Sequence, residues 1–166
     1  DLAEFKRPMV KIDMPVHCDA RLFLEELDRQ IDQSDYDKHK HQGWQAWCRE
    51  RVSKYPVVLE RHRTFNGKIN PYHFIETLFS RLADDDVVVC ANATACIVPF
   101  QTAFLKKGQR LFSNSGAASM GHDLPAAIGS AVAREGKRVI CLAGDGSMQL
   151  NIQELQTIAH HQLPTK

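Results

Sequence analysis

The sequence lacks the compositional marks of several classes of protein. It contains no run of about 18 apolar residues, the length that a membrane-spanning helix needs. It has no basic excess either, because 21 Lys and Arg against 20 Asp and Glu leave a net charge of +1. We therefore expect no nucleic-acid partner and no membrane partner. The five cysteines are odd in number and include no C-x-x-C pair, which favours reduced thiols and predicts a cytoplasmic protein.

Two common nucleotide-binding motifs are absent as well. The chain contains no G-x-G-x-x-G dinucleotide fingerprint, and no Gly-Lys-Ser/Thr follows its glycines, which excludes a P-loop. Its 166 residues are 43% hydrophobic and 25% charged, as is typical of a globular protein with a buried core. Length and composition therefore predict one domain, or one domain with a connector, and the function must be inferred from the motifs.

The first part of the chain shows two helical patterns between polar stretches. We predict a short strand at residues 8–12, a helix that begins after an N-cap at Asp19, and a second helix over residues 44–54. Residues 28–43 are polar and charged, which is typical of a connector. An Asn-Gly pair at residues 66–67 predicts a turn in the loop that follows the second helix.

From residue 70 onward, helices and strands alternate. Asn70 is a predicted N-cap and Pro71 the first helical residue. Further helices are expected over 123–134, with Asp123 as the cap, and after 147 as one continuous helix. Strands are predicted at residues 87–91, 111–112 and 138–143. Apolar strands that alternate with helices predict an α/β fold, with a parallel sheet flanked by helices.

The clearest local motif is Gly144-Asp145-Gly146-Ser147, between a predicted strand and a predicted helix. Ligands of open α/β sheets bind outside the carboxyl ends of the strands, and glycines let the backbone approach a ligand closely. The N-terminus of a helix favours phosphate, and a carboxylate beside phosphate indicates a bridging Mg²⁺. The alternative is a tight Asp-Gly turn with a solvated carboxylate.

A second motif is a loop of small residues, 114–122, that leads into the helix predicted at 123–134. Small side chains would let its carbonyls and amides reach a ligand. Met120 is unusual in such a loop, because its apolar side chain needs something to pack against. The alternative is that Met120 fills a gap in the core.

Together, the two motifs resemble those of thiamine-diphosphate enzymes of the acetolactate synthase and 2-oxoacid decarboxylase group. Residues 115–129 are similar to the family signature S-G-x-x-x-M-G-x-x-L-P-A-A-I-G. Residues 151–155 match the N-I-Q-E-L that follows G-D-G-S in acetolactate synthase large subunits. The resemblance implies three segments, which are the tail of a preceding central domain (1–30), a connector with one helix (31–69) and a partial diphosphate-binding domain (70–166).

The resemblance also implies roles for individual residues. Asp145 would ligate Mg²⁺, while Gly144, Gly146 and Ser147 would hold the diphosphate of thiamine diphosphate. Met120 would be the apolar wedge that bends the cofactor into a V shape, which brings its 4′-imino group close to the thiazolium C2.

Two further cofactor contacts follow from the same resemblance. The carbonyl of Ala118 would accept a hydrogen bond from the 4′-amino group of the cofactor. Thr94 would donate to a phosphate oxygen. It lies in the stretch Ala93-Thr94-Ala95-Cys96, where acetolactate synthases carry G-Q-H-Q.

The resemblance implies a 2-oxoacid decarboxylating carboligase that binds a small 2-oxoacid and works as a homodimer or homotetramer. We assign no catalytic residue here, because the family's essential glutamate belongs to a different domain. The Asn-Asn pair that closes the family's G-D-G-S motif does not occur before Lys166. We therefore expect these residues to be a catalytically silent part of a longer enzyme. The alternatives are another thiamine-diphosphate decarboxylase or C–C lyase, and a non-catalytic phosphate- or nucleotide-binding module.

Overall fold

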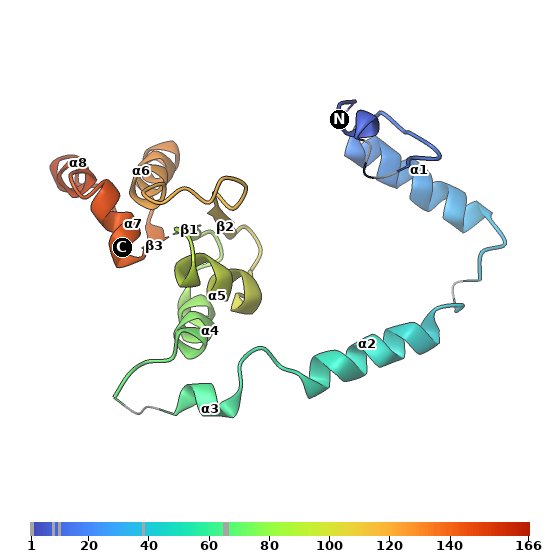
Figure 1. Cartoon of the computed structure of the whole chain (residues 1–166), viewed down its shortest axis with the longest axis horizontal. Helices are drawn as coiled ribbons and strands as arrows, with labels where there is room; N and C mark the ends of the chain where they lie inside the picture. Colours follow the sequence, from blue (N-terminus) through green and yellow to red (C-terminus); the bar gives the residue numbers. More distant parts are fainter. Residues whose placement is uncertain (1, 8, 10, 38, 65–66) are drawn as a thin grey trace. The chain divides into compact units, whose positions relative to one another are not determined.

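The computed structural model describes residues 2–7, 9, 11–37, 39–64 and 67–166. The chain forms two compact units, one that ends at Lys54 and one that comprises Tyr55–Lys166 (Figure 1). Among the described residues, none of the helices has the length and apolar character required to cross a bilayer.

The N-terminal unit consists of a 3₁₀ turn, Glu4–Lys6, and two helices, α1 (Ala20–Gln33) and α2 (Gln42–Lys54). The predicted N-cap is confirmed, since the Asp19 side chain accepts a hydrogen bond from the backbone N–H of Arg21 at 2.9 Å. Of the predicted strand at 8–12, two residues lie outside the described part of the chain. The other three, Met9, Lys11 and Ile12, are exposed and form no strand.

Helix α1 continues into the stretch that the sequence predicts to be a polar connector. Arg29 explains the extension, because its guanidinium donates to Glu26 at 2.8 Å and to Gln33 at 2.7 Å. Side chains three and four residues apart face each other on a helix, so a charged surface can support the helix without apolar packing. The polar composition of this stretch was therefore compatible with a helix.

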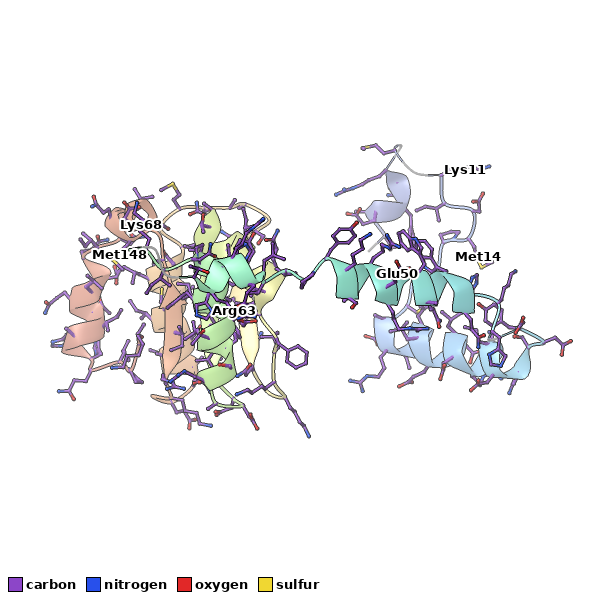
Figure 2. The ribbon with its side chains drawn as sticks, turned by 90° about the horizontal axis from the view of Figure 1, so that it is seen from below. Lys11, Met14, Glu50, Arg63, Lys68 and Met148 are labelled. Carbon is purple, nitrogen blue, oxygen red and sulfur yellow. The ribbon has the colours of Figure 1, made fainter. Side chains whose placement is uncertain are left out.

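The second unit begins with α3 (Glu60–Arg63), followed by α4 (Pro71–Arg81). Arg63, labelled in Figure 2, pairs with Glu76 and so ties α3 to α4. Of the predicted Asn-Gly turn, Asn66 lies outside the described residues, and Gly67 has a φ of +88°. The predicted start of α4 is confirmed, because the Asn70 side chain accepts from the N–H of Tyr72 at 3.0 Å.

A three-stranded parallel sheet forms the centre of this unit, as predicted. Its order is β2-β1-β3, with β1 in register with both neighbours. The strands are β1 (Val87–Cys90), β2 (Arg110–Ser113) and β3 (Val139–Leu142). The helices after α4 are α5 (Thr94–Thr102), α6 (Asp123–Ala133), α7 (Asp145–Leu150) and α8 (Glu154–His160).

Both faces of the sheet are covered, which explains why β1 is apolar at every position (Figure 1). Val88 and Cys90 face the helices α4 and α5, in a cluster that also contains Phe79. The alternate residues of β1 face α6, where Ala127 and Ala131 are fully buried. Small side chains on α6 let this helix approach the sheet closely.

The last residues of the chain pair with β3. The N–H of Val139 donates to the carbonyl of Pro164 at 3.1 Å, and the N–H of Lys166 donates to the carbonyl of Val139 at 2.9 Å. Thr165 thereby forms a parallel bridge with Val139, on the free edge of β3. Gln162, at a φ of +50°, turns the chain back to the sheet directly after α8.

Two helices, α7 and α8, follow β3, whereas the sequence predicts one helix after a turn at 144–147. Asn151 follows α7 with φ −135° and ψ 34°, outside helical geometry. Its side chain donates instead to the carbonyl of Gly121 at 2.6 Å. A bond to a residue thirty positions away competes here with continuation of the helix.

Candidate functional site

The loops that follow the three strands meet at the carboxyl edge of the sheet. Thr94 and Gly144 line the same cavity, of about 440 Å³, between α4, α5 and the end of β3. The loop after β2 carries Ala118, whose carbonyl lies 3.5 Å from the Nδ2 of Asn92, just after β1. The structure thus gathers the residues that the motifs single out, although they come from three separate stretches of sequence.

The Gly144-Asp145-Gly146-Ser147 motif forms the start of α7. Gly144 is the N-cap, and the first backbone hydrogen bond of the helix joins Met148, labelled in Figure 2, to the Gly144 carbonyl at 2.9 Å. The Asp145 carboxylate is exposed, and its Oδ1 accepts from the N–H of Gly146 at 2.8 Å. The other oxygen is thus available to a hard cation.

Asp145 is not part of a larger cluster of metal-binding side chains among the residues that the structure describes. Within the described ranges, no three His, Cys, Asp or Glu side chains come together in a group that could hold a metal. Any metal at Asp145 would therefore complete its coordination with groups from outside these side chains, such as phosphate oxygens, as Mg²⁺ commonly does.

Met120 lies against α7 rather than in the core. Its side chain is 50% exposed, so it does not fill a core gap, which was the alternative interpretation. A Cβ built on Gly146 would lie only 3.2 Å from the Met120 Cε. The absence of a side chain at Gly146 gives room to the end of the Met120 side chain, which keeps half of its surface exposed for contact with another group.

The loop that carries Met120 is anchored at its start. The thiol of Cys96, in the first turn of α5, donates to the hydroxyl of Ser113 at 3.4 Å, and that hydroxyl contacts Ser115. Within the loop, the N–H of Ala118 donates to the carbonyl of Asn114 at 2.6 Å. Ala118 adopts a φ of +51°, a left-handed conformation that is unusual for a residue with a side chain.

A hydrogen-bonded network at the end of this loop joins residues of two segments, and we call it the Gly121 clamp. It consists of Gly121, Asp123, Ser147 and Asn151. The N–H of Gly121 donates to the Oγ of Ser147 at 2.8 Å, and the Ser147 hydroxyl donates to the Asp123 Oδ1 at 3.2 Å. Asn151 holds the Gly121 carbonyl. The clamp therefore joins the Met120 loop to α7.

Sequence analysis missed the clamp because it took Asp123 to be an N-cap. The structure places His122 in that position, with Asp123 as the first helical residue and completely buried. A carboxylate so close to the apolar run of α6 was the available signal, since a cap is usually solvated and a buried acid needs a partner.

Two of the thiols near the site, those of Cys90 and Cys141, stay protonated. All five cysteines are free. Burial raises the pKa of Cys90 and of Cys141 to about 12, so both stay protonated at neutral pH. Neither thiol is suited to act as a nucleophile.

Comparison with known proteins supports the same conclusion as this geometry. Residues 94–166 match a family model described as "Thiamine pyrophosphate enzyme, C-terminal TPP binding domain". These residues belong to the thiamine pyrophosphate enzymes. The match covers α5, β2 and everything that follows, including both motifs of the site.

Relatives of this thiamine pyrophosphate-enzyme domain extend the similarity to most of the chain. The acetolactate synthase isozyme 3 large subunit of Escherichia coli K12 is 33% identical over 93% of this chain and 27% of its own length. The acetolactate synthase large subunit of Pyropia yezoensis is 53% identical over 75% of this chain and 20% of its own length. The predicted resemblance to acetolactate synthase large subunits is confirmed, and the chain spans about a quarter of the length of these relatives.

Proposed function

We propose that this chain forms the part of a 2-oxoacid decarboxylating carboligase, similar to acetolactate synthase, that binds thiamine diphosphate and Mg²⁺. The observation that carries the proposal is the contact of Met120 with Gly146, beside the exposed carboxylate of Asp145. An apolar wedge, a hard oxygen ligand and unobstructed backbone lie together there. This set suits a cofactor with an aromatic part and a metal-bound diphosphate.

The structure sharpens the expected contacts with the diphosphate. The Ser147 hydroxyl already has two partners in the Gly121 clamp, so we assign the backbone N–H of Ser147 to the diphosphate instead. Nothing lies within 4 Å of a Cβ placed on Gly144, so the backbone can be approached there. Thr94, exposed at the first position of α5, would donate its hydroxyl to a phosphate oxygen. Asp145 would ligate the Mg²⁺.

Met120 and Ala118 would orient the remainder of the cofactor. Met120 offers a half-exposed thioether as the wedge, and Ala118 offers a backbone carbonyl to the amino group. When bound, thiamine diphosphate supplies a carbanion and an electron sink for decarboxylation of a 2-oxoacid. In this proposal, the residues of this chain position the bound cofactor, and the cofactor supplies the chemistry.

Several features of the whole protein belong to the same proposal. They are a 2-oxoacid substrate, a homodimer or homotetramer, a catalytic glutamate on another domain and a cytoplasmic location. We also keep the assignment of 1–30, 31–69 and 70–166 to a domain tail, a connector and a partial diphosphate-binding domain. The boundary between the two compact units, at Lys54, falls within the proposed connector. The names of the relatives favour a carboligase over another decarboxylase or C–C lyase.

The test is thermal unfolding of the natural protein with added ligands. We expect thiamine diphosphate with Mg²⁺ to raise the unfolding temperature, whereas NAD and ATP leave it unchanged, because a ligand that binds only the folded state stabilises it. The substitution Asp145→Ala should abolish the metal-dependent shift. Asp84→Ala removes an exposed carboxylate just before β1, at the other end of the strand, and serves as the matched control.

Two results would contradict the proposal. Stabilisation by ATP or NAD without thiamine diphosphate would indicate the alternative, a phosphate- or nucleotide-binding module. An unchanged metal-dependent shift in Asp145→Ala would show that Asp145 is only a turn residue.

A further inference from the structure

The Gly121 clamp holds both polar groups of one glycine with side chains from a different part of the fold. Ser147, on α7, accepts the Gly121 N–H at 2.8 Å, and Asn151, just after α7, donates to the Gly121 carbonyl at 2.6 Å. Gly121 directly follows Met120, and Ser147 follows Asp145 by two positions. Any displacement of the clamp therefore moves the wedge relative to the proposed metal ligand.

The contact at Gly121 is too close for any side chain. A Cβ there would lie 2.8 Å from the Nδ2 of Asn151 and 2.9 Å from the Cβ of Leu150, and the φ of +82° already favours glycine. The backbone of the loop thus packs directly on the side chains of Leu150 and Asn151, at the end of α7. The clamp sets this distance through the Ser147 and Asn151 side chains, which bond directly to the Gly121 backbone.

Asp123 gives the clamp its direction. A serine hydroxyl has a single proton to donate, and Ser147 can accept from Gly121 only if that proton points elsewhere. The Ser147 hydroxyl donates this proton in a hydrogen bond to the Asp123 Oδ1, and the two oxygens lie 3.2 Å apart. Ser147 is 2% exposed there, and Asp123 is fully buried. The carboxylate therefore orients the hydroxyl toward the backbone of the loop.

Asp123 is costly for the fold by itself. Its second oxygen, Oδ2, is buried and has no hydrogen-bond partner. A buried polar atom without a partner destabilises a protein, and an apolar side chain of similar size avoids that cost. Stability alone therefore does not account for an aspartate at this position.

We infer that Asp123 is a positioning residue for the cofactor site, which acts through Ser147 to fix the Gly121 peptide and hold Met120 against the helix that carries Asp145. Its effect on the cofactor rests on the proposed function. Its effect on the Gly121 peptide does not, and can be measured without any ligand.

The experiment compares Asp123→Leu, which lacks an acceptor, with Asp123→Asn, which keeps a carbonyl oxygen at the Oδ1 position. Two quantities are measured on the natural protein, namely hydrogen exchange of the Gly121 amide without ligand and the Kd for thiamine diphosphate with Mg²⁺. We expect Asp123→Leu to accelerate the exchange by about fivefold, which corresponds to the loss of one ordinary hydrogen bond, and to raise the Kd. Asp123→Asn should restore both values toward those of the wild type.

The unfolding temperature separates positioning from a merely structural role. We expect it not to fall in Asp123→Leu, since the unpartnered oxygen is removed, even though the Kd rises. Ser147→Ala should also accelerate exchange of the Gly121 amide and raise the Kd. Combining it with Asp123→Leu should add little to either effect, because the two residues act in series. Ser147→Ala also tests the clamp if Asp123→Leu does not fold.

The inference would be overturned if Asp123→Leu showed the same Gly121 exchange rate and the same Kd as the wild type. If Asp123→Leu fails to fold, the same result in Ser147→Ala would overturn it. Absence of thiamine diphosphate binding by the wild type would instead refute the proposed function. In that case the exchange rates alone decide whether Asp123 holds the Gly121 peptide.

Discussion

Replacing Ala93 by glycine should stabilise the second unit. Ala93 joins β1 to α5 with φ +48° and ψ −135°, a combination that residues with a Cβ rarely adopt. Strain of this kind costs about 1–3 kcal/mol, whereas glycine lowers stability by about 0.4–1 kcal/mol through the greater freedom of the unfolded chain. Ala93 is exposed, so losing its methyl group sacrifices little burial. We expect a net gain of about 1 kcal/mol in the free energy of unfolding.

Urea unfolding followed by circular dichroism measures this gain as a higher midpoint with an unchanged m value. The control is Ala133→Gly, because Ala133 is also exposed but ends α6 in helical geometry. There, glycine should cost about 0.5–1 kcal/mol. If Ala93→Gly lowered the midpoint as Ala133→Gly does, the backbone at Ala93 would not be strained and the reasoning would be refuted.

Two further predictions concern the Gly121 clamp and the ion pair between Asp86 and Arg138. Gly121→Ala should destabilise the fold by more than about 2 kcal/mol in urea unfolding, through positive φ and steric overlap, whereas Gly129→Ala, with open space on α6, should stabilise it by about 0.5–1 kcal/mol. Equal effects would show that the Gly121 contact yields easily. The Arg138 guanidinium holds the pKa of the buried Asp86 carboxyl below its usual range. The contribution of Asp86 to the free energy of unfolding is therefore full above about pH 4 and is lost as the pH falls through the folded pKa. Asp86→Asn should flatten the acid limb of a profile of stability against pH. An unchanged acid limb would contradict this role of Asp86.

The parts of the fold that depend on local sequence could be predicted. The caps at Asp19 and Asn70 are each recognised from the polar side chain and the helical pattern that follows. The apolar run of β1 predicted a strand buried on both faces, which is how it lies. In each of these cases the decisive interaction joins residues that are close in sequence, or depends only on polarity.

The features that were missed depend on contacts between distant residues. The break between α7 and α8 reflects the bond from Asn151 to Gly121, and the burial of Asp123 reflects its bond to Ser147. No periodicity or propensity of residues 145–160 contains this information. The extension of α1 was missed for another reason, since the polarity of that stretch is equally compatible with a connector and with an exposed helix.

The candidate site was predicted from motifs, and the structure adds how it is assembled. The motifs identified Met120 and Gly146 separately, but not that the missing side chain of Gly146 gives room to the end of Met120. They also suggested Ser147 as a diphosphate contact, through either its backbone or its hydroxyl. The structure shows that the Ser147 hydroxyl holds the Met120 loop, which a list of motif residues cannot reveal.

The strand order has a consequence for synthesis of the protein on the ribosome. The central strand β1 is the first of the three in sequence, and it pairs with β3 across 52 positions, from Val87 to Val139. After β2 ends at Ser113, another 29 residues must be made before β3 is complete at Leu142, which takes about 1.5–6 s at ordinary rates. During that interval one edge of an entirely apolar strand is unpaired, and such an edge can recruit other chains. The nascent chain is thus most vulnerable to aggregation just before β3 emerges.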